Sequence, residues 1–224
     1  MLKPEVLVDF LKDNHVTFYS GVPDSLLKDF CAYVDDEFPK DNHIIAANEG
    51  AAIGLGIGYH LSSGKIPLIY LQNSGLGNTV NPLLSLASSE VYSIPILLLI
   101  GWRGEPGVKD EPQHIHQGRV TPNLLDAMDI PYSIIDSQMS QDEVLNSIND
   151  QLEICNKEKK PVCVLVRKGT FETYKKKSNE SPHNDLKLDN CMFKSDNPDE
   201  VHAIFDLSLI HISEPTRLRR ISYA

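Results

Sequence analysis

Short apolar runs alternate with segments of helical periodicity along most of the chain. In residues 4–14, Val6, Leu7, Phe10 and Leu11 recur at the spacing of one helical face. The same criteria predict strands at 16–22, 43–47, 66–71, 93–102, 131–135 and 162–167, and helices at 26–34, 49–62, 78 or 79–87, 121–128 and 141–156. Apolar strands separated by helices favour parallel strands buried on both faces, joined by right-handed crossovers. We therefore predict an α/β fold, a doubly wound and mostly parallel sheet flanked by helices, with ligands bound at the carboxyl ends of the strands.

Composition narrows the class of protein. The 224 residues carry a net charge of -10, and the basic residues form no long stripe, which argues against nucleic-acid binding. The longest apolar run, 94–100, is too short to cross a bilayer, and no leader-like segment opens the chain. The four cysteines lack zinc-ligand spacing and are typical of reduced thiols. We expect a cytoplasmic protein without nucleic-acid or membrane partners.

The character of the sequence changes near residue 170. Residues 1–170 are expected to form the main domain, and the polar, lysine-containing stretch 171–195 is typical of a linker. Residues 196–207 resemble the beginning of a second, truncated domain. The tail 208–224 resembles translated sequencing-adaptor DNA, so we expect it to be non-native and assign it no function.

Glu49 follows a short apolar strand and begins a helix rich in small residues. A carboxylate is stabilised near a helix N-terminus, and this charge alone could explain its position. Three glycines in the helix, Gly54, Gly56 and Gly58, are costly there, and a close approach of a backbone or ligand is the usual compensation. Their spacing and their place inside the helix argue against a dinucleotide-binding loop.

A second segment of interest, 72–82, follows the strand at 66–71. Its glycines and short polar side chains form a turn that leads into a helix, where backbone N–H groups are available to an anion or a polar ring. By itself, this pattern is also compatible with an ordinary strand-to-helix loop.

The segment 101–118 follows the most apolar strand and has the length of a functional loop. His114 and His116 suit acid–base chemistry or anion recognition, or are simply solvated; no partner at clear spacing favours a metal site. Arg103 matches carboxylate or phosphonate oxygens, or else forms a salt bridge with Glu105 or Asp110.

Four segments in this order resemble one family: GVPDSLL at 21–27, AANEG at 46–50, QNSGLGNTVNPLLSL at 72–86 and IGWRGEPGVKDEPQHIHQG at 100–118. Together they are similar to the phosphonopyruvate decarboxylases, which are thiamine-diphosphate-dependent 2-oxoacid decarboxylases, and, more distantly, to the α subunit of sulfopyruvate decarboxylase. The resemblance extends from the N-terminus to KGTF at 168–171.

The resemblance implies that residues 1–170 are a thiamine-diphosphate pyrimidine-binding domain. Magnesium and the diphosphate would be held by a C-terminal domain through a GDG motif that this sequence lacks. The substrate would be a small anionic 2-oxoacid, and the full-length enzyme would be at least a homodimer.

The resemblance also implies roles for particular residues. Glu49 would contact N1′ of the pyrimidine. Catalytic roles are predicted for Glu49, Asp24, His114 and His116, although Asp24 could instead be a plain helix cap. Cofactor contacts are predicted for Glu49, Gln72, Asn73, Ser74, Gly75 and Asn78, and substrate contacts for Ser25, Arg103 and Gln113; no metal ligand is expected in this chain. The alternatives are a complete sulfopyruvate decarboxylase α subunit and an inactive isolated binding domain.

Overall fold

The computed structural model describes residues 1–177. Its centre is a six-stranded sheet in the order β2-β1-β3-β4-β6-β5, and all neighbouring strands run parallel. The strands are β1 (Tyr19–Gly21), β2 (His43–Ile45), β3 (Leu68–Gln72), β4 (Leu97–Gly101), β5 (Tyr132–Ile135) and β6 (Val162–Val166). The predicted fold class is confirmed.

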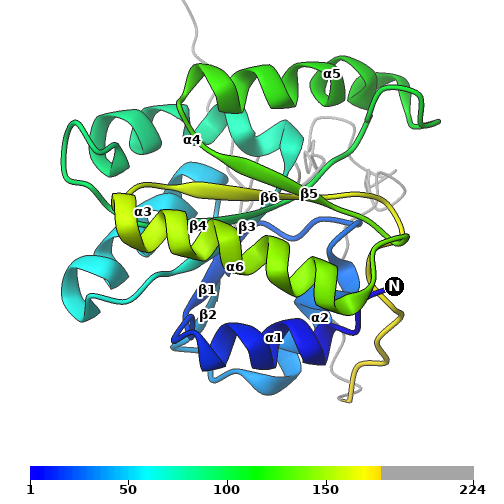
Figure 1. Ribbon diagram of the computed structural model, residues 1–224, viewed down its shortest axis with the longest axis horizontal. Coiled ribbons are helices and arrows are strands. Elements are labelled where there is room, and N and C mark those ends of the chain that lie inside the picture. Colours follow the sequence, from blue (N-terminus) through cyan, green and yellow to red (C-terminus); the bar gives the residue numbers. More distant parts are fainter. Residues whose placement is uncertain (178–224) are drawn as a thin grey trace, which may run out of the picture.

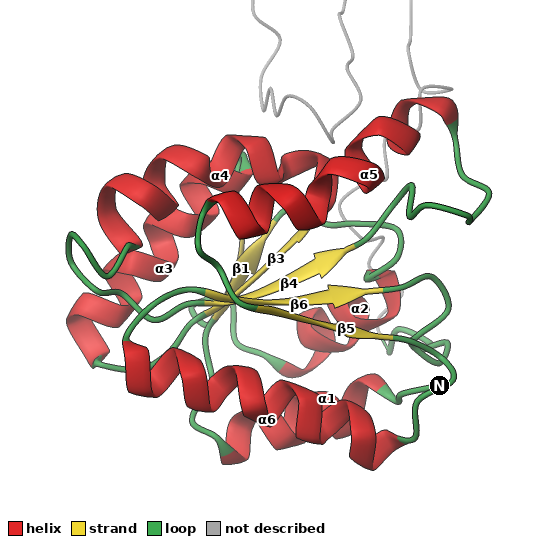
Figure 2. Cartoon of the chain, turned by 45° about the horizontal axis from the view of Figure 1, so that its top comes forward, coloured by secondary structure: helices red, strands yellow, loops and turns green. Residues whose placement is uncertain are grey.

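Helices cover both faces of the sheet (Figure 1). They are α1 (Pro4–Asp13), α2 (Lys28–Glu37), α3 (Glu49–Ser63), α4 (Leu76–Pro82), α5 (Pro112–Ala127) and α6 (Gln141–Glu158). A 3-10 turn, Asn73–Gly75, precedes α4, and a π-helical turn, Leu83–Ala87, follows it. Figure 2 shows α4 and α5 on one side of the strands and α1, α2 and α6 on the other.

The core is divided between the two faces. Alternate side chains of one strand enter different apolar clusters: in β4, Leu97 and Leu99 join the cluster with α1, α2 and α6, while Leu98 and Ile100 join the one with α3, α4 and α5. All five residues of β4 and of β6 are buried, as expected for central strands of a parallel sheet. Local signals fix the helix ends, such as the Ser140–Glu143 capping box of α6 and the left-handed Gly64 after α3.

Two predictions of helix boundaries are wrong. The helix expected at 121–128 begins at Pro112, so His114 and His116 lie on α5 rather than in a loop. The N-cap of α2 is Leu27, without a side-chain hydrogen bond, so Asp24 does not cap this helix. Asp24 instead accepts a hydrogen bond from the Leu26 N–H at 3.0 Å, inside the turn before α2.

The chain after β6 returns to the first helices of the domain. Phe171 pairs with Leu2 in an isolated parallel bridge, and the Tyr174 N–H donates to Asp29 at 3.0 Å. Residues 171–177, at the start of the expected linker, therefore pack on the domain. The rest of that linker, the expected second domain at 196–207 and the expected tail at 208–224 lie outside the described residues. Within residues 1–177, no helix is long and apolar enough to cross a membrane.

Candidate functional site

The polar residues singled out in the sequence gather at the carboxyl edge of the sheet. Asp24 follows β1, Glu49 follows β2, Asn73 follows β3 and Arg103 follows β4. Because these four strands are parallel neighbours, their carboxyl ends meet at one edge. Residues as far apart in the chain as Asp24 and Arg103 therefore lie at one edge of the sheet.

Glu49 is the first residue of α3 and is only 4% exposed. Its side chain points towards the turn after β3, where Asn78 Nδ2 donates to Oε2 at 2.8 Å. The helix has a cap of its own, because the Asn48 side chain accepts from the Ala51 N–H at 2.9 Å. A buried, hydrogen-bonded carboxylate is more than a surface charge that favours the helix dipole, and it offers a proton acceptor inside the site.

Glycines allow α3 and the turn at 73–78 to approach each other. A Cβ atom at position 75 would lie 2.3 Å from Glu49 Oε1, and one at position 50 would lie 2.9 Å from the carbonyl oxygen of Asn78. The Glu49 carboxylate thus fills the space that a side chain at position 75 would need. The glycine of this turn is required by packing against the candidate catalytic group.

Asp24 is a second buried acid, 5% exposed, at the end of β1. One oxygen, Oδ2, accepts from Leu26, while Oδ1 is buried and has no hydrogen-bond partner among the residues that the structure describes. A Cβ atom at position 101 would lie 2.0 Å from Oδ2, so Gly101 at the end of β4 makes room for this acid. Burial raises the pKa of Asp24 to about 6, and nearby Arg103 opposes part of that rise.

Arg103 lies next to Asp24 and is held in a fixed orientation. Its Nε and Nη2 atoms donate to the two oxygens of Asp110 at 2.8 and 2.5 Å, and Nη1 donates to Ser25 Oγ at 2.9 Å. Of the two salt-bridge partners that the sequence offers for Arg103, Asp110 is the one that it contacts. Glu105, the other candidate partner, pairs with Arg167 instead.

Asn73 connects β3, β4 and α5. Its Nδ2 donates to the Arg103 carbonyl oxygen and to Thr121 Oγ1, both at 2.9 Å, and its Oδ1 accepts from the Arg103 N–H at 3.0 Å. Since the residue is 2% exposed, its amide fixes the backbone of Arg103 from the inside. Thr121 was not singled out in the sequence, because nothing local indicates that it meets the end of β3.

The other predicted cofactor contacts lie along the same turn. Gln72 Nε2 donates to Ser74 Oγ at 2.6 Å, and both residues are half-buried. Asn78 is exposed apart from its bond to Glu49. The structure therefore brings Glu49, Gln72, Ser74, Gly75 and Asn78 together around one turn.

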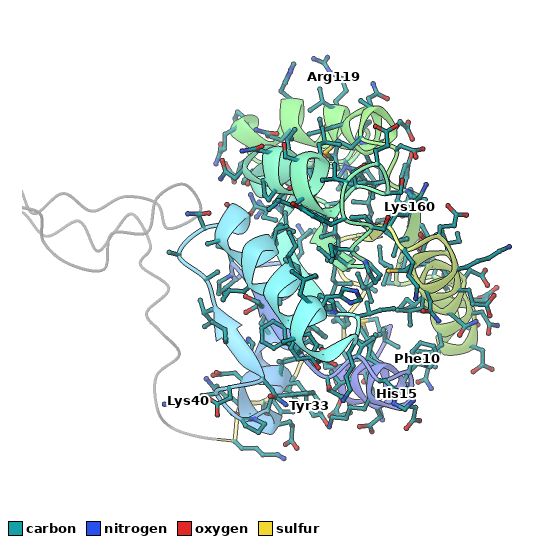
Figure 3. The ribbon with its side chains drawn as sticks, turned by 90° about the vertical axis from the view of Figure 1, so that its left-hand side faces the viewer. Phe10, His15, Tyr33, Lys40, Arg119 and Lys160 are labelled. Atoms are coloured by element: carbon teal, nitrogen blue, oxygen red, sulfur yellow. The ribbon has the colours of Figure 1, made fainter. Side chains whose placement is uncertain are left out.

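The two histidines lie on the first turns of α5. His114 is half-buried, while His116 and Gln113 are exposed, and His116 Nδ1 lies 2.9 Å from Arg119 Nη2. Figure 3 shows Arg119 projecting outwards at the periphery of the molecule. Among residues 1–177 no group of three or more His, Cys, Asp or Glu side chains is arranged to hold a metal ion.

An apolar groove lies between β2 and α3. Its volume is about 700 Å³. One wall is the face of α3 that carries the small residues Ala51, Gly54 and Gly58, whose small size leaves room for the groove. Ile45 and Leu55, each 37% exposed, also line it. The later glycines of α3 face different surfaces: Gly56 packs on Ile69 in the core, whereas Cβ atoms at Gly54 and Gly58 would meet nothing within 4 Å.

The described domain is therefore doubly wound, with a buried glutamate at the start of a helix, next to a glycine-containing turn. Residues 4–130 match the family described as thiamine pyrophosphate enzyme, N-terminal TPP binding domain. The chain belongs to this family, whose coenzyme is also called thiamine diphosphate.

Relatives with known names fall into two groups. The chain is 41% identical over 129 residues to a phosphonopyruvate decarboxylase of Streptomyces viridochromogenes, covering 58% of this chain and 32% of that protein. It is 36% identical over 163 residues to a sulfopyruvate decarboxylase subunit alpha of Methanococcus maripaludis, covering 72% of this chain and 92% of that protein. The chain therefore spans about a third of the first relative and nearly all of the second.

A solved structure has the same fold. A thiamine diphosphate-dependent 4-hydroxybenzoylformate decarboxylase of Rhodococcus jostii superimposes with a TM-score of 0.57 at 21% identity, over 78% of this chain and 31% of that chain. At this identity the match concerns the fold alone.

Proposed function

We propose that this chain is the pyrimidine-binding half of a thiamine-diphosphate-dependent 2-oxoacid decarboxylase whose substrate is 3-phosphonopyruvate, which is converted into phosphonoacetaldehyde and CO2. The observation that carries the proposal is the buried Glu49 carboxylate beside the Gly75 turn, in a chain of the thiamine pyrophosphate family. The 41% identity to a phosphonopyruvate decarboxylase supports the choice of substrate.

The residues at Glu49 fit the coenzyme. A buried carboxylate can share a proton with a ring nitrogen, and Asn78 holds it in place without neutralising it. The polar turn Gln72–Asn78 would offer hydrogen bonds to the remaining edges of the ring. When bound, thiamine diphosphate supplies the nucleophilic carbon and the electron sink for loss of CO2. The chain's contribution is to orient the ring and to hold the proton at Glu49; the magnesium ion and the diphosphate would be held outside the described residues.

The anionic substrate would meet Arg103, Ser25 and Asp24 at the ends of β4 and β1. A guanidinium group suits phosphonate or carboxylate oxygens. With a pKa of about 6, Asp24 is poised to exchange a proton near neutral pH. His114, His116 and Gln113, at the start of α5, remain candidates for contact with the substrate once the site is complete.

The groove between β2 and α3 supports the need for a second protein half. Its lining is apolar and Ile45 and Leu55 are partly exposed, which is the character of a contact surface. We propose that the diphosphate-binding half, from a second subunit, packs there and closes the cofactor site, so that the complete enzyme is at least a dimer.

A decarboxylation assay tests the proposed function. The chain is combined with a diphosphate-binding half, Mg²⁺ and thiamine diphosphate, and CO2 release from 3-phosphonopyruvate is measured. Glu49→Gln should lower turnover by about 100-fold or more, because the amide cannot accept the proton. The matched control is Glu90→Gln. Glu90 is exposed and is not one of the proposed site residues, so this variant should retain full turnover. Equal activity of Glu49→Gln and the unmodified chain would refute the role of Glu49.

A second substrate is favoured by one specific observation, the 92% coverage of a sulfopyruvate decarboxylase alpha subunit. In that case the chain would act with a separate β chain on sulfopyruvate, whose sulfonate also suits Arg103. Comparing the kcat/KM values of the two substrates with the same complete enzyme distinguishes these functions. Titration of thiamine diphosphate into the 224-residue chain alone tests the third alternative, an isolated binding domain; we expect weak or undetectable binding.

A further inference from the structure

The carboxylate of Asp110, in the loop between β4 and α5, accepts hydrogen bonds from several protein groups. Its two oxygens accept from Arg103 Nε at 2.8 Å and Nη2 at 2.5 Å, from the Gly104 N–H at 2.8 Å and from the Glu111 N–H at 2.8 Å. These donors hold the pKa of Asp110 well below its ordinary value. An acid that is so fully engaged does not exchange protons near neutral pH, so its contribution must be positional.

The position that Asp110 imposes on Arg103 decides which donors remain for a ligand. A guanidinium group has two forks, one formed by Nε and Nη2 and the other by Nη1 and Nη2. Asp110 occupies the first fork. Nη1 and Nη2 carry two N–H groups each; Nη2 gives one to Asp110 and Nη1 gives one to Ser25 Oγ at 2.9 Å, so each of these nitrogens keeps one N–H. Arg103 therefore presents a single edge, on the side of β1.

Ser25 completes this edge. Its hydroxyl oxygen accepts from Arg103, so its own O–H proton remains available to an acceptor, and the residue is exposed. The edge is rigid from the backbone side as well, because Asn73 binds both the N–H and the carbonyl oxygen of Arg103. A prepositioned, three-donor edge of this kind matches the oxygens of a tetrahedral phosphonate or sulfonate.

We propose that Asp110 is the positioning residue that fixes Arg103, so that the Nη1–Nη2 edge of Arg103 and the Ser25 hydroxyl together bind the anionic tail of the 2-oxoacid. This inference rests on the proposed function and deepens it. It assigns Asp110 a part in substrate recognition, and it excludes a side-on, Nε-edge contact between Arg103 and the substrate.

The test is a set of variants in the complete enzyme, with KM and kcat measured separately for 3-phosphonopyruvate and for sulfopyruvate. Asp110→Asn should raise the KM for the substrate used by at least about tenfold, the effect of losing one charge-assisted contact, while kcat stays within about twofold. The matched control is Asp136→Asn, because Asp136 likewise pairs with an arginine, Arg167, at 2.9 Å near a strand end but makes no contact with Arg103. Its KM should stay within about twofold.

A double-mutant cycle separates positioning from general weakening of the loop. Arg103→Lys keeps the charge but not the two forks, so it should raise KM in the unmodified enzyme and add little in the Asp110→Asn background. Ser25→Ala, at an exposed position that does not threaten folding, should raise KM by about threefold or more.

The outcomes are distinguishable. Equal KM values for Asp110→Asn and Asp136→Asn, strictly additive effects of Asp110→Asn and Arg103→Lys, or an unchanged KM for Ser25→Ala would each overturn the proposed edge. Absence of CO2 release from either substrate by the unmodified complete enzyme would instead overturn the proposed function.

Discussion

Asp24→Asn should stabilise the domain at neutral pH. In the folded chain the carboxyl group is buried and one of its oxygens has no partner among the described residues, which raises its pKa from 3.8 to about 6. One pKa unit corresponds to about 1.4 kcal/mol, so keeping Asp24 ionised at pH 7.5 costs roughly 3 kcal/mol of folding free energy. An asparagine has nearly the same shape, can still accept from Leu26 and carries no charge.

The sign of the pH dependence follows from the direction of the shift. The folded protein keeps the Asp24 proton between about pH 4 and pH 6, whereas the unfolded chain has lost it. The contribution of Asp24 to stability is therefore fully present below pH 4 and is lost as the pH rises through 6. Asp24→Asn should gain less than about 1 kcal/mol at pH 4 and about 3 kcal/mol at pH 7.5.

Urea unfolding of the 224-residue chain at these two pH values measures the effect. Asp13→Asn, at an exposed position of α1, is the control for removing one negative charge, and its effect should remain within about 0.5 kcal/mol at both pH values. A gain from Asp24→Asn that does not change with pH, or a loss of stability at pH 7.5, would show that the buried charge is not the cause.

Further predictions concern the glycines that permit close contacts. Gly75→Ala should lower the free energy of unfolding by about 1 to 3 kcal/mol, because its Cβ would collide with the Glu49 carboxylate. Gly77→Ala, in the next turn, has open space around its Cβ and should leave stability unchanged or raise it by up to about 1 kcal/mol; thermal unfolding compares the two variants, and equal effects would argue against the contact. Gly118→Ala should cost about 2 to 3 kcal/mol, since a Cβ there would lie 1.8 Å from the Gly104 carbonyl oxygen; a melting temperature like that of Gly77→Ala would contradict this packing.

The order and type of the strands and helices could be predicted because their signals are local. The run 93–102 is apolar at every position that β4 buries, and the stretch rich in small residues after Glu49 lies within the 15-residue helix α3. The same local pattern located Glu49 and Arg103 at strand ends, and parallel topology then brought them to one edge.

The beginning of α5 could not be predicted from local pattern. The sequence from Pro112 to Gly118 is polar and contains no apolar stripe, which is typical of a loop. Its helical form is stabilised by tertiary contacts, in which Trp102 Nε1 donates to the Gly118 carbonyl oxygen at 2.9 Å and Gly104 admits the helix backbone. Pro112 at the first turn was a usable signal for the helix start.

The orientation of side chains in the site could not be predicted from the sequence. Asn73 meets Arg103 thirty positions away, and its amide faces β4 and α5 because two backbone groups and Thr121 satisfy it there. The sequence indicates Asp110 only as a possible salt-bridge partner of Arg103, because the spacing between the two residues matches no regular element. The hydrogen-bond partners of such side chains depend on which groups each amide or carboxylate contacts after folding.

The hydrogen bonds of the Asn73 amide restrict the main chain at the carboxyl edge of the sheet. By joining the ends of two strands to a helix, it sets the backbone of Arg103 when the chain folds, not when a ligand arrives. Little motion of the main chain is then needed for capture of an anion, and the entropy lost on association is correspondingly small. Thr121, whose hydroxyl accepts from this amide, should accordingly share the mutational sensitivity of Asn73.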